Sequence, residues 1–124
     1  RDYKVTGVQT CALPISVIGS EQGKSRPVVV ISEDEINDLL NTVNIIPITS
    51  RKEGRRIYPN EVLIPANNFG LSNESIILCH QIRTIDKKRI SQAYGHISDT
   101  NIHTEIIEAL CFQIGIDLAN STNR

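Results

Sequence analysis

The loop before one short apolar run carries the residues best suited to chemistry on an anion. Residues 19–27 have the sequence Gly-Ser-Glu-Gln-Gly-Lys-Ser-Arg-Pro and lead into Val28–Ile31, a β-branched run that favours a buried strand. Because Pro27 cannot donate a ladder hydrogen bond, we expect it at the start of this strand, which fixes Arg26 beside the polar loop. A guanidinium held there is suited to binding a phosphate. The alternative is a solvated β-turn with an ordinary surface arginine.

Two further polar clusters fall at expected strand ends. They consist of Thr49, Ser50 and Arg51 in one case and of His80 and Gln81 in the other. If the strands are neighbours in a sheet, these side chains line one face together with Arg26. His80 is expected to be a groove or packing residue, although a histidine of ordinary pKa, about 6.5, could also act as a base. Thr49 could equally be only a strand-forming residue.

Motifs for other kinds of catalysis are absent from the sequence. It has no His-Glu-x-x-His zinc motif, no phosphate-binding P-loop and no Ser-His-Asp order typical of a hydrolase. Its 3 cysteines include no Cys-x-x-Cys pair, so neither a disulfide framework nor a zinc site is supported. The remaining Arg, Thr, Ser, Gln and Glu side chains suit metal-free chemistry on a phosphodiester, in which the protein stabilises charge on the phosphorus oxygens. No cofactor is expected.

Length, charge and hydropathy limit the number of domains, the binding partners and the cellular location that we expect for the chain. A chain of 124 residues suits one domain with a modest core. The net charge of -1 argues against non-specific binding of duplex nucleic acid, but it is compatible with a local basic groove. No apolar run is long enough to span a bilayer and no signal peptide is evident, so we expect a cytoplasmic protein without membrane contact.

The elements that must position these residues are mostly short strands. After the strand that ends near residue 32, the sequence predicts strands at residues 43–50, 58–64, 75–85 and 90–97, the longest being 75–85. Strands joined by polar turns and followed by one closing helix predict a strongly bent antiparallel sheet or partial barrel.

Two helices are expected. A capping-box pattern with Ser32 as N-cap predicts a short helix through about residue 40, with Ile36, Leu39 and Leu40 facing inward. Asp99 is expected to cap a C-terminal helix, and Gly115 to end it. The apolar face of this second helix is expected to comprise Ile102, Ile106, Ile107, Leu110 and Ile114.

Four stretches together resemble the MazF/PemK family of toxin endoribonucleases. They are residues 19–31, Pro-Ile-Thr-Ser at 47–50, Gln-Ile-Arg-Thr-Ile-Asp-Lys-Lys-Arg at 81–89 and Gly-His-Ile at 95–97. The resemblance covers residues 17–116. It implies a mainly β (α+β) fold, a small SH3-like partial barrel of antiparallel strands with a C-terminal helix. It also implies a homodimeric toxin of a type II toxin-antitoxin system, an mRNA interferase that cleaves single-stranded RNA at a short sequence.

The resemblance also implies roles for individual residues. Arg26 and Thr49 match the family's catalytic Arg and Thr. In that family the ribose 2′-OH attacks the adjacent phosphorus, and the products carry a 2′,3′-cyclic phosphate and a 5′-hydroxyl. Arg26 would neutralise the phosphorane and Thr49 would hydrogen-bond a phosphate oxygen. The expected RNA-binding residues are Ser20, Glu21, Gln22, Lys24, Ser50, Arg51, His80 and Gln81.

The implied partners are mRNA and a cognate antitoxin. A disordered tail of the antitoxin is expected to occupy the RNA groove. The toxin–antitoxin complex is expected to bind its own promoter DNA through the antitoxin. The alternatives are a CcdB-like, non-enzymatic toxin that binds a topoisomerase, and an inactive truncated toxin.

The first residues depart from the family pattern. Residues 5–15, Val-Thr-Gly-Val-Gln-Thr-Cys-Ala-Leu-Pro-Ile, resemble the translation of a common short-read sequencing adapter. We interpret residues 1–16 as non-native, 17–116 as the toxin domain and 117–124 as a polar tail. On this interpretation the first strand of the barrel is missing or replaced. The alternative is that the first residues form a genuine strand, because Tyr3-Lys4-Val5-Thr6 alternates. His80 is a further departure, because the family often has Glu at this position.

Overall fold

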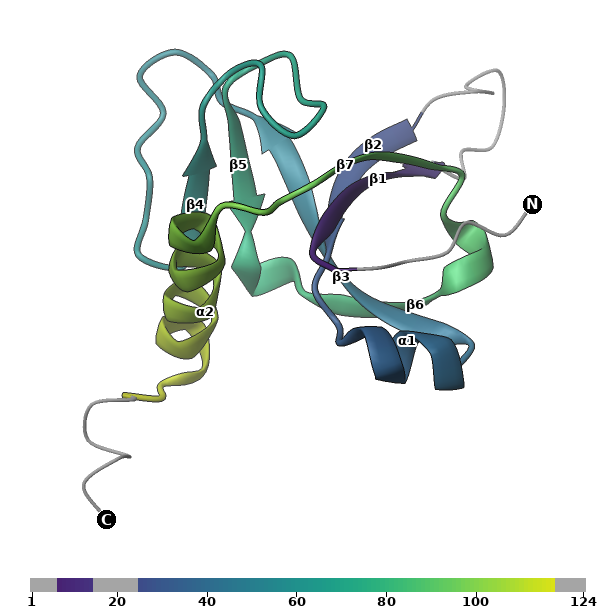
Figure 1. The fold of residues 1–124 in the computed structure, drawn as a ribbon. Coiled ribbons are helices and arrows are strands. Elements are labelled where there is room, and N and C mark those ends of the chain that lie inside the picture. The colour runs from purple at the N-terminus through teal and green to yellow at the C-terminus, as the bar shows by residue number, and fades with distance from the viewer. Residues whose placement is uncertain (1–6, 15–24, 118–124) are drawn as a thin grey trace, which may run out of the picture.

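The computed structural model describes residues 7–14 and 25–117, which form a seven-stranded antiparallel sheet with one long helix packed against it (Figure 1). The strands are β1 Gln9–Pro14, β2 Ser25–Val30, β3 Thr42–Ser50, β4 Glu61–Ile64, β5 Ser75–Leu78, β6 Arg83–Asp86 and β7 Gln92–His96. The α-helices are α1 Asp34–Leu39 and α2 Thr100–Ile114, and two 3-10 helices are η1 Cys79–Gln81 and η2 Lys87–Arg89. This arrangement confirms the predicted mainly β fold with a C-terminal helix.

Strand β3 is the longest and organises the sheet. Along one edge it pairs with β2, where Val28 lies opposite Pro47. Along the other edge it pairs first with β6 and then, through residues 48–50, with β5. The full strand order is β4-β5-β3-β2-β1-β7, with β6 attached to β3. The strand therefore joins the two halves of the molecule, as Figure 1 shows.

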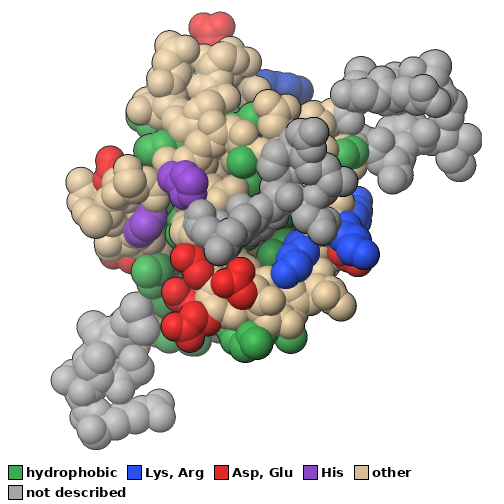
Figure 2. All heavy atoms as spheres, turned by 45° about the vertical axis from the view of Figure 1, so that its right-hand side comes forward, with side chains coloured by type: hydrophobic (Ala, Val, Ile, Leu, Met, Phe, Trp, Pro, Cys, Tyr) green, Lys and Arg blue, Asp and Glu red, His purple; other side chains and the backbone are tan. Residues whose placement is uncertain are grey.

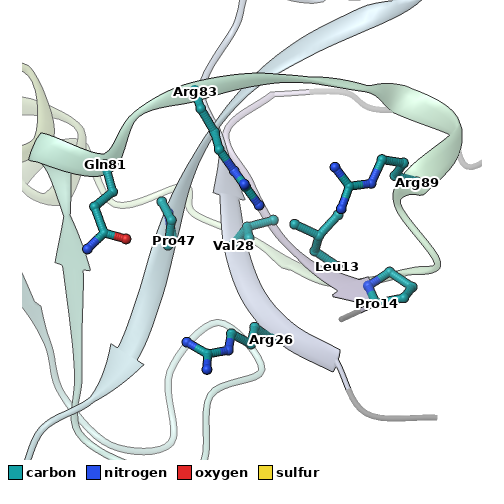
Figure 3. Close-up of a pocket in the computed structure, with 8 residues that line it drawn as sticks. All are labelled: Leu13, Pro14, Arg26, Val28, Pro47, Gln81, Arg83 and Arg89. Atoms are coloured by element: carbon teal, nitrogen blue, oxygen red, sulfur yellow. The ribbon is translucent and has the colours of Figure 1, made fainter. Parts of the chain in front are cut away.

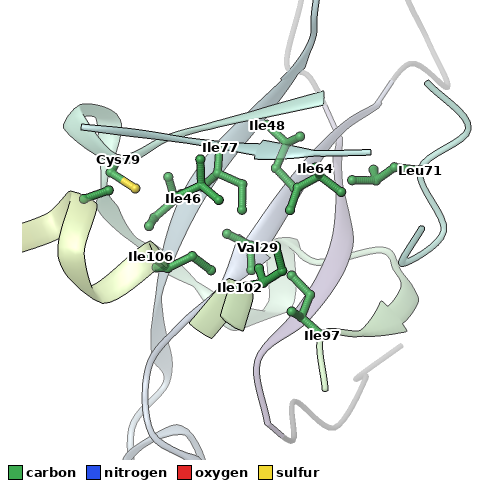
Figure 4. Close-up of a cluster of buried hydrophobic side chains, with 12 residues drawn as sticks. Val29, Ile46, Ile48, Ile64, Leu71, Ile77, Cys79, Ile97, Ile102 and Ile106 are labelled. Atoms are coloured by element: carbon green, nitrogen blue, oxygen red, sulfur yellow. The ribbon is translucent and has the colours of Figure 1, made fainter. Parts of the chain in front are cut away.

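Alternate side chains of β3 contribute to two separate cores, because successive residues of a strand point to opposite faces. Ile46 and Ile48 enter the larger core, which α2 covers with Ile102 and Ile106 (Figure 4). Ile45 belongs to the smaller core on the other face, which is closed by β1 and β6. The smaller core consists of Cys11, Leu13, Val28, Val30, Val43, Ile45, Ile85 and Ile90.

Helix α2 follows its sequence prediction closely. The Asp99 carboxylate accepts hydrogen bonds from the backbone N–H groups of Asn101 and Ile102, as an N-cap should. Gly115 has a φ of 76°, in the left-handed region that glycine tolerates, and ends the helix. The predicted apolar face is only partly buried, however, because Ile114 is 65% exposed.

Helix α1 corrects the prediction of a capping box at Ser32. The helix begins at Asp34, with Glu33 as N-cap and no capping hydrogen bond from a side chain. The Ser32 hydroxyl instead donates to the Asn37 side chain and accepts from the backbone N–H of Asn44, so it ties the end of β2 to β3. Asn37 is the one buried residue of α1.

The predicted inward face of α1 is also wrong. Ile36, Leu39 and Leu40 are 45%, 79% and 50% exposed. The helix is held by polar contacts rather than by an apolar stripe: besides the Ser32 bonds, Lys87 donates to the carbonyl of Asn37. The first turn of α1 carries the acidic residues Asp34 and Glu35. Figure 2 shows acidic side chains gathered on the lower part of the drawn face.

The predicted long strand at residues 75–85 is interrupted. Its two parts, β5 and β6, both run along β3, but from Ile77 to Arg83 the chain advances six residues while the partners on β3 go only from Ile48 to Ile45, three residues. The extra residues form η1, which bulges out of the sheet. Such insertions often redirect side chains near functional sites, and this one carries His80 and Gln81.

Two other strands are shorter than predicted, while the strand predicted at 43–50 is found as β3, Thr42–Ser50. The strand expected at 58–64 begins at Glu61, and the strand expected at 90–97 spans Gln92–His96. None of the helices among the described residues has the length and apolarity needed to cross a bilayer.

The position of a first strand is occupied by β1, which lies between β2 and β7. Cys11, Ala12 and Leu13 are buried there. Two polar residues, Gln9 and Thr10, are buried too, and the Thr10 hydroxyl donates to the carbonyl of Phe69 at 2.6 Å. A segment expected to be foreign thus forms a strand of the sheet, paired on both sides and next to the end strand β7.

Candidate active site

A groove of about 410 Å³ opens where β1, β2 and β3 face η1 and η2 (Figure 3). The cross-strand pair of Val28 and Pro47 supplies apolar surface in its centre. The residues that line it are Leu13, Pro14, Arg26, Val28, Pro47, Gln81, Arg83 and Arg89. None of these lining residues is acidic, so the groove is cationic.

Arg26 lies near the start of β2, as the sequence predicted. It is exposed and sits opposite Leu13 in the pairing of β2 with β1. Pro27 follows at the next position and faces Ala12. The backbone of Arg26 is therefore part of a paired strand, while its side chain extends into the groove (Figure 3).

Two further arginines line the groove, and neither was predicted from the sequence as a site residue. Arg83 comes from β6 and Arg89 from η2, and both are exposed. Among the described residues, the ion pairs join Arg51 to Glu74 and Arg55 to Glu61, and no carboxylate pairs with Arg26, Arg83 or Arg89. These guanidinium groups are available to an anionic ligand. Alternation within the strand expected at 75–85 would have placed Arg83 on the face of Gln81, but in the structure Gln81 belongs to η1 and Arg83 to β6, and no local pattern pointed to Arg89.

Thr49 lies on the same face of the sheet as the groove but is not one of its lining residues. It is two positions after Pro47 on β3, so the strand alternation places both on one face. The paired register of β2 and β3 ends at Val28 and Pro47, and one further alternation in each strand leads to Arg26 and Thr49. Thr49 itself pairs with Ile76 of β5 and is exposed, as is Ser50.

The η1 turn separates two cavities. Gln81 lines the arginine groove, whereas His80 lines a second cavity of about 620 Å³ between residues 55–61 and α2. The two side chains contact each other, with 3.3 Å between Gln81 Nε2 and His80 Nε2. The structure thus brings Gln81 together with Arg26 and puts His80 just beyond the groove.

The other expected RNA-binding residues lie elsewhere. Arg51 does not line the groove: its Nη1 donates to Glu74 at 3.1 Å and its Nε to the carbonyl of Arg55 at 2.9 Å. The bond to Arg55 folds the loop after β3 back on itself, and the bond to Glu74 ties this loop to the residue before β5. Ser20, Glu21, Gln22 and Lys24 lie outside the described residues.

A charged pair supports the base of η1. The Glu61 carboxylate accepts two hydrogen bonds of 2.7 Å from the Arg55 guanidinium and one of 2.9 Å from the backbone N–H of Tyr58. The Arg55 hydrogen bonds lower the pKa of Glu61, against the opposing effect of burial. Glu61 pairs with Leu78, the residue before η1. Burial, with the Glu61 charge, raises the pKa of the adjacent Cys79 thiol to about 11.

The described residues offer no evident metal site. Nowhere in residues 7–14 and 25–117 do three or more His, Cys, Asp or Glu side chains gather as metal ligands would. What the groove offers is three guanidinium groups, an amide and apolar surface, a set that can bind phosphate oxygens with planar, bidentate hydrogen bonds.

The bent antiparallel sheet, the packed C-terminal helix and the cationic groove define a small β protein suited to binding a polyanion. Residues 4–113 match the family described as PemK-like, MazF-like toxin of type II toxin-antitoxin system. The chain therefore belongs to this toxin family. The match begins at residue 4 and so includes β1.

Individual relatives agree with this assignment. The chain is 37% identical over 100 residues to Endoribonuclease EndoA of Bacillus subtilis, which covers 81% of this chain and 84% of the relative. A MazE-MazF structure from Deinococcus radiodurans is 27% identical with a TM-score of 0.71, covering 94% of this chain and 100% of that one. The Mycobacterium tuberculosis toxin MazF-mt6 has the same fold, with a TM-score of 0.71 at 22% identity over 88% of this chain and 98% of that one.

Proposed function

We propose that the chain is a metal-independent endoribonuclease that cleaves single-stranded RNA, such as mRNA, at a short sequence. The observation that carries this proposal is the groove in which Arg26 lies with Arg83 and Arg89, with no acidic side chain among the described residues that line it. The relative from Bacillus subtilis is named an endoribonuclease, which supports the same reaction for this chain.

The proposed reaction uses the 2′-hydroxyl of the RNA itself. Its oxygen attacks the adjacent phosphorus as the hydroxyl gives up its proton to solvent, and the bond to the 5′-oxygen breaks. The leaving 5′-oxygen takes a proton, for which Arg26 is the proposed donor, so the products carry a 2′,3′-cyclic phosphate and a 5′-hydroxyl. The phosphorane gains negative charge, which the anchored guanidinium of Arg26 neutralises, and this stabilises the transition state more than the substrate. The Thr49 hydroxyl donates to a phosphate oxygen from the same face of the sheet.

Other residues bind the RNA around the reacting phosphate. Gln81, within the groove, can hydrogen-bond a base edge through its amide. His80 contacts Gln81 and continues the RNA path out of the groove. Ser50 and Arg51 adjoin Thr49, and Ser20, Glu21, Gln22 and Lys24 precede Arg26 in the sequence, so we assign them to the same substrate.

The proposed protein partners follow from the family. A cognate antitoxin inhibits the chain by laying an acidic tail in the cationic groove, and the structures of MazE with MazF support an antitoxin partner. The complex binds its own promoter DNA through the antitoxin. The toxin itself acts as a cytoplasmic homodimer.

Incubation of the purified protein with RNA of mixed sequence in EDTA tests this function. Discrete fragments that end in a 2′,3′-cyclic phosphate are expected. Inhibition of a topoisomerase without RNA cleavage would instead support a CcdB-like toxin, and neither activity would indicate an inactive chain.

A further inference from the structure

Arg83 and Arg89 have no role in the cleavage step proposed above. They come from β6 and η2, whereas Arg26 comes from β2, yet all three line one groove. Figure 3 shows the Arg83 and Arg89 side chains entering the groove from the side opposite Arg26, with Val28 and Leu13 between them in this view. The cationic surface is therefore wider than a single phosphate needs.

The backbone holds both arginines in place. Arg83 is paired with Ile45 of β3, and Ile85, two residues later, is buried in the smaller core. Arg89 ends η2, whose first turn is capped by the Asp86 carboxylate, and buried Ile90 follows it. Each guanidinium thus projects from an anchored backbone position, which reduces the entropy lost when it binds an anion.

The electrostatic arrangement points to a ligand with several charges. Like charges gathered on one surface repel one another, and among the described residues no carboxylate pairs with either side chain. The successive phosphates of a nucleic-acid backbone can each neutralise one guanidinium group, whereas a single anion would neutralise only part of the positive charge.

We propose that Arg83 and Arg89 bind backbone phosphates of the RNA other than the one that is cleaved. This inference rests on the proposed function, and it divides the groove by role. Arg26 serves the reacting phosphate and Gln81 the bases, while Arg83 and Arg89 supply affinity without sequence information, as phosphate contacts do.

The salt dependence of binding tests the proposal. The probe is a short RNA with a 2′-deoxy sugar at the cut site, which blocks the proposed reaction, and its Kd is measured by fluorescence anisotropy over a range of salt concentrations. Arg83→Ala and Arg89→Ala should each weaken binding about tenfold. Each should also lower the slope of log K against log salt by about 0.7, the value for one phosphate of a single strand.

Lys88→Ala is the matched control. Lys88 is the neighbour of Arg89 in η2, carries the same charge and is exposed, but does not line the groove. Its substitution should leave the slope unchanged. Arg83→Lys and Arg89→Lys should recover most of the slope, because the charge is kept. Circular dichroism and Tm of each variant check that the fold is retained.

Cleavage kinetics separate binding from catalysis. Arg83→Ala and Arg89→Ala should raise KM with kcat within about twofold of wild type, because they remove binding common to substrate and transition state. Unchanged slopes, or slopes that change equally in Lys88→Ala, would overturn the proposal. A variant that weakens only antitoxin binding would overturn it too.

The same data distinguish this proposal from the proposed function. If the wild-type protein binds the probe but does not cleave the matching all-ribose RNA, the proposed function is wrong, while the slopes still test the two arginines. If it cleaves RNA and both variants behave like Lys88→Ala, only the phosphate contacts are wrong.

Discussion

At the scale of single residues, the groove concentrates positive charge in a protein with a net charge of -1. The sequence placed Arg26 correctly at the rim of the sheet, because Pro27 and the β-branched run fixed the strand locally. Gln81 lines the same groove as Arg26, while its role in binding RNA stays a prediction. Arg83 and Arg89 were missed, because the contacts that bring them to the groove are long-range. In the sequence, Arg89 belongs to a charged run typical of a solvated turn.

Thr49 offers a test of the hydroxyl proposed to contact the phosphate. Thr49→Ala should reduce kcat by about tenfold to a hundredfold, since it removes one hydrogen bond to a charged group. Thr49→Ser keeps the hydroxyl and should retain much of the activity. The measurement is single-turnover cleavage of a short RNA. Equal losses in both variants would show that the methyl group or the strand geometry matters, and not the hydroxyl.

Among the secondary-structure elements, the bulge at η1 is the feature that the sequence predicted least well. Alternation along residues 75–85 predicted one continuous strand, whereas the structure has two strands, β5 and β6, which both pair with β3. The insertion that presents His80 and Gln81 depends on pairing with β3, which no local pattern reports. The predicted capping box of α1 was wrong for a related reason. The Ser32 hydroxyl bonds to the Asn37 side chain and to the backbone of Asn44, and it does not cap the helix.

The Arg55–Glu61 pair below η1 predicts a pH dependence of stability. The pKa of Glu61 is lowered in the folded state by the Arg55 hydrogen bonds. Ionised Glu61 therefore stabilises the fold above the unfolded pKa of about 4.3, and this contribution is lost as the pH falls through the lower folded pKa. We expect Glu61→Gln to lower Tm at pH 7 and to flatten the acid decline of Tm.

The matched control for this pH dependence is Glu108→Gln on α2, an exposed glutamate. It should leave both Tm at pH 7 and the acid decline close to wild type. Identical acid profiles for wild type and Glu61→Gln, measured by thermal denaturation between pH 7 and 3, would contradict the role given to this pair.

At the scale of the whole molecule, the first strand raises the question of residues 1–16. We propose that these residues are adapter-derived and that residues 9–14 occupy the place of a native strand. This proposal rests on the resemblance of residues 5–15 to a translated sequencing adapter, because the buried polar residues of β1, Gln9 and Thr10, both have hydrogen-bond partners in the fold. Replacing residues 1–16 by a family-type first strand should raise Tm and activity, as measured by thermal denaturation and RNA cleavage. A marked loss of folding would show instead that β1 is native.

The exposed apolar surface predicts self-association. Phe112 and Ile114 of α2 are 61% and 65% exposed, and β4 and β7 are the ends of the strand order. Apolar patches and open strand edges are commonly covered by a second copy. We expect a two-fold dimer by analytical ultracentrifugation at micromolar concentration, in a chain with a native first strand. A monomer under these conditions would contradict the expected homodimer.

RNA cleavage through Arg26 is tested most directly by single-turnover cleavage of a short RNA that contains the preferred site. It is carried out in EDTA, with analysis of the product ends. Wild type should give a 2′,3′-cyclic phosphate, Arg26→Ala should lose about a hundredfold to a thousandfold in rate with RNA binding largely kept, and Arg26→Lys should recover only part of it. An RNA with a 2′-deoxy sugar at the cut site should not be cleaved. Cleavage by Arg26→Ala at the wild-type rate, or unchanged cleavage of the 2′-deoxy RNA, would contradict the account.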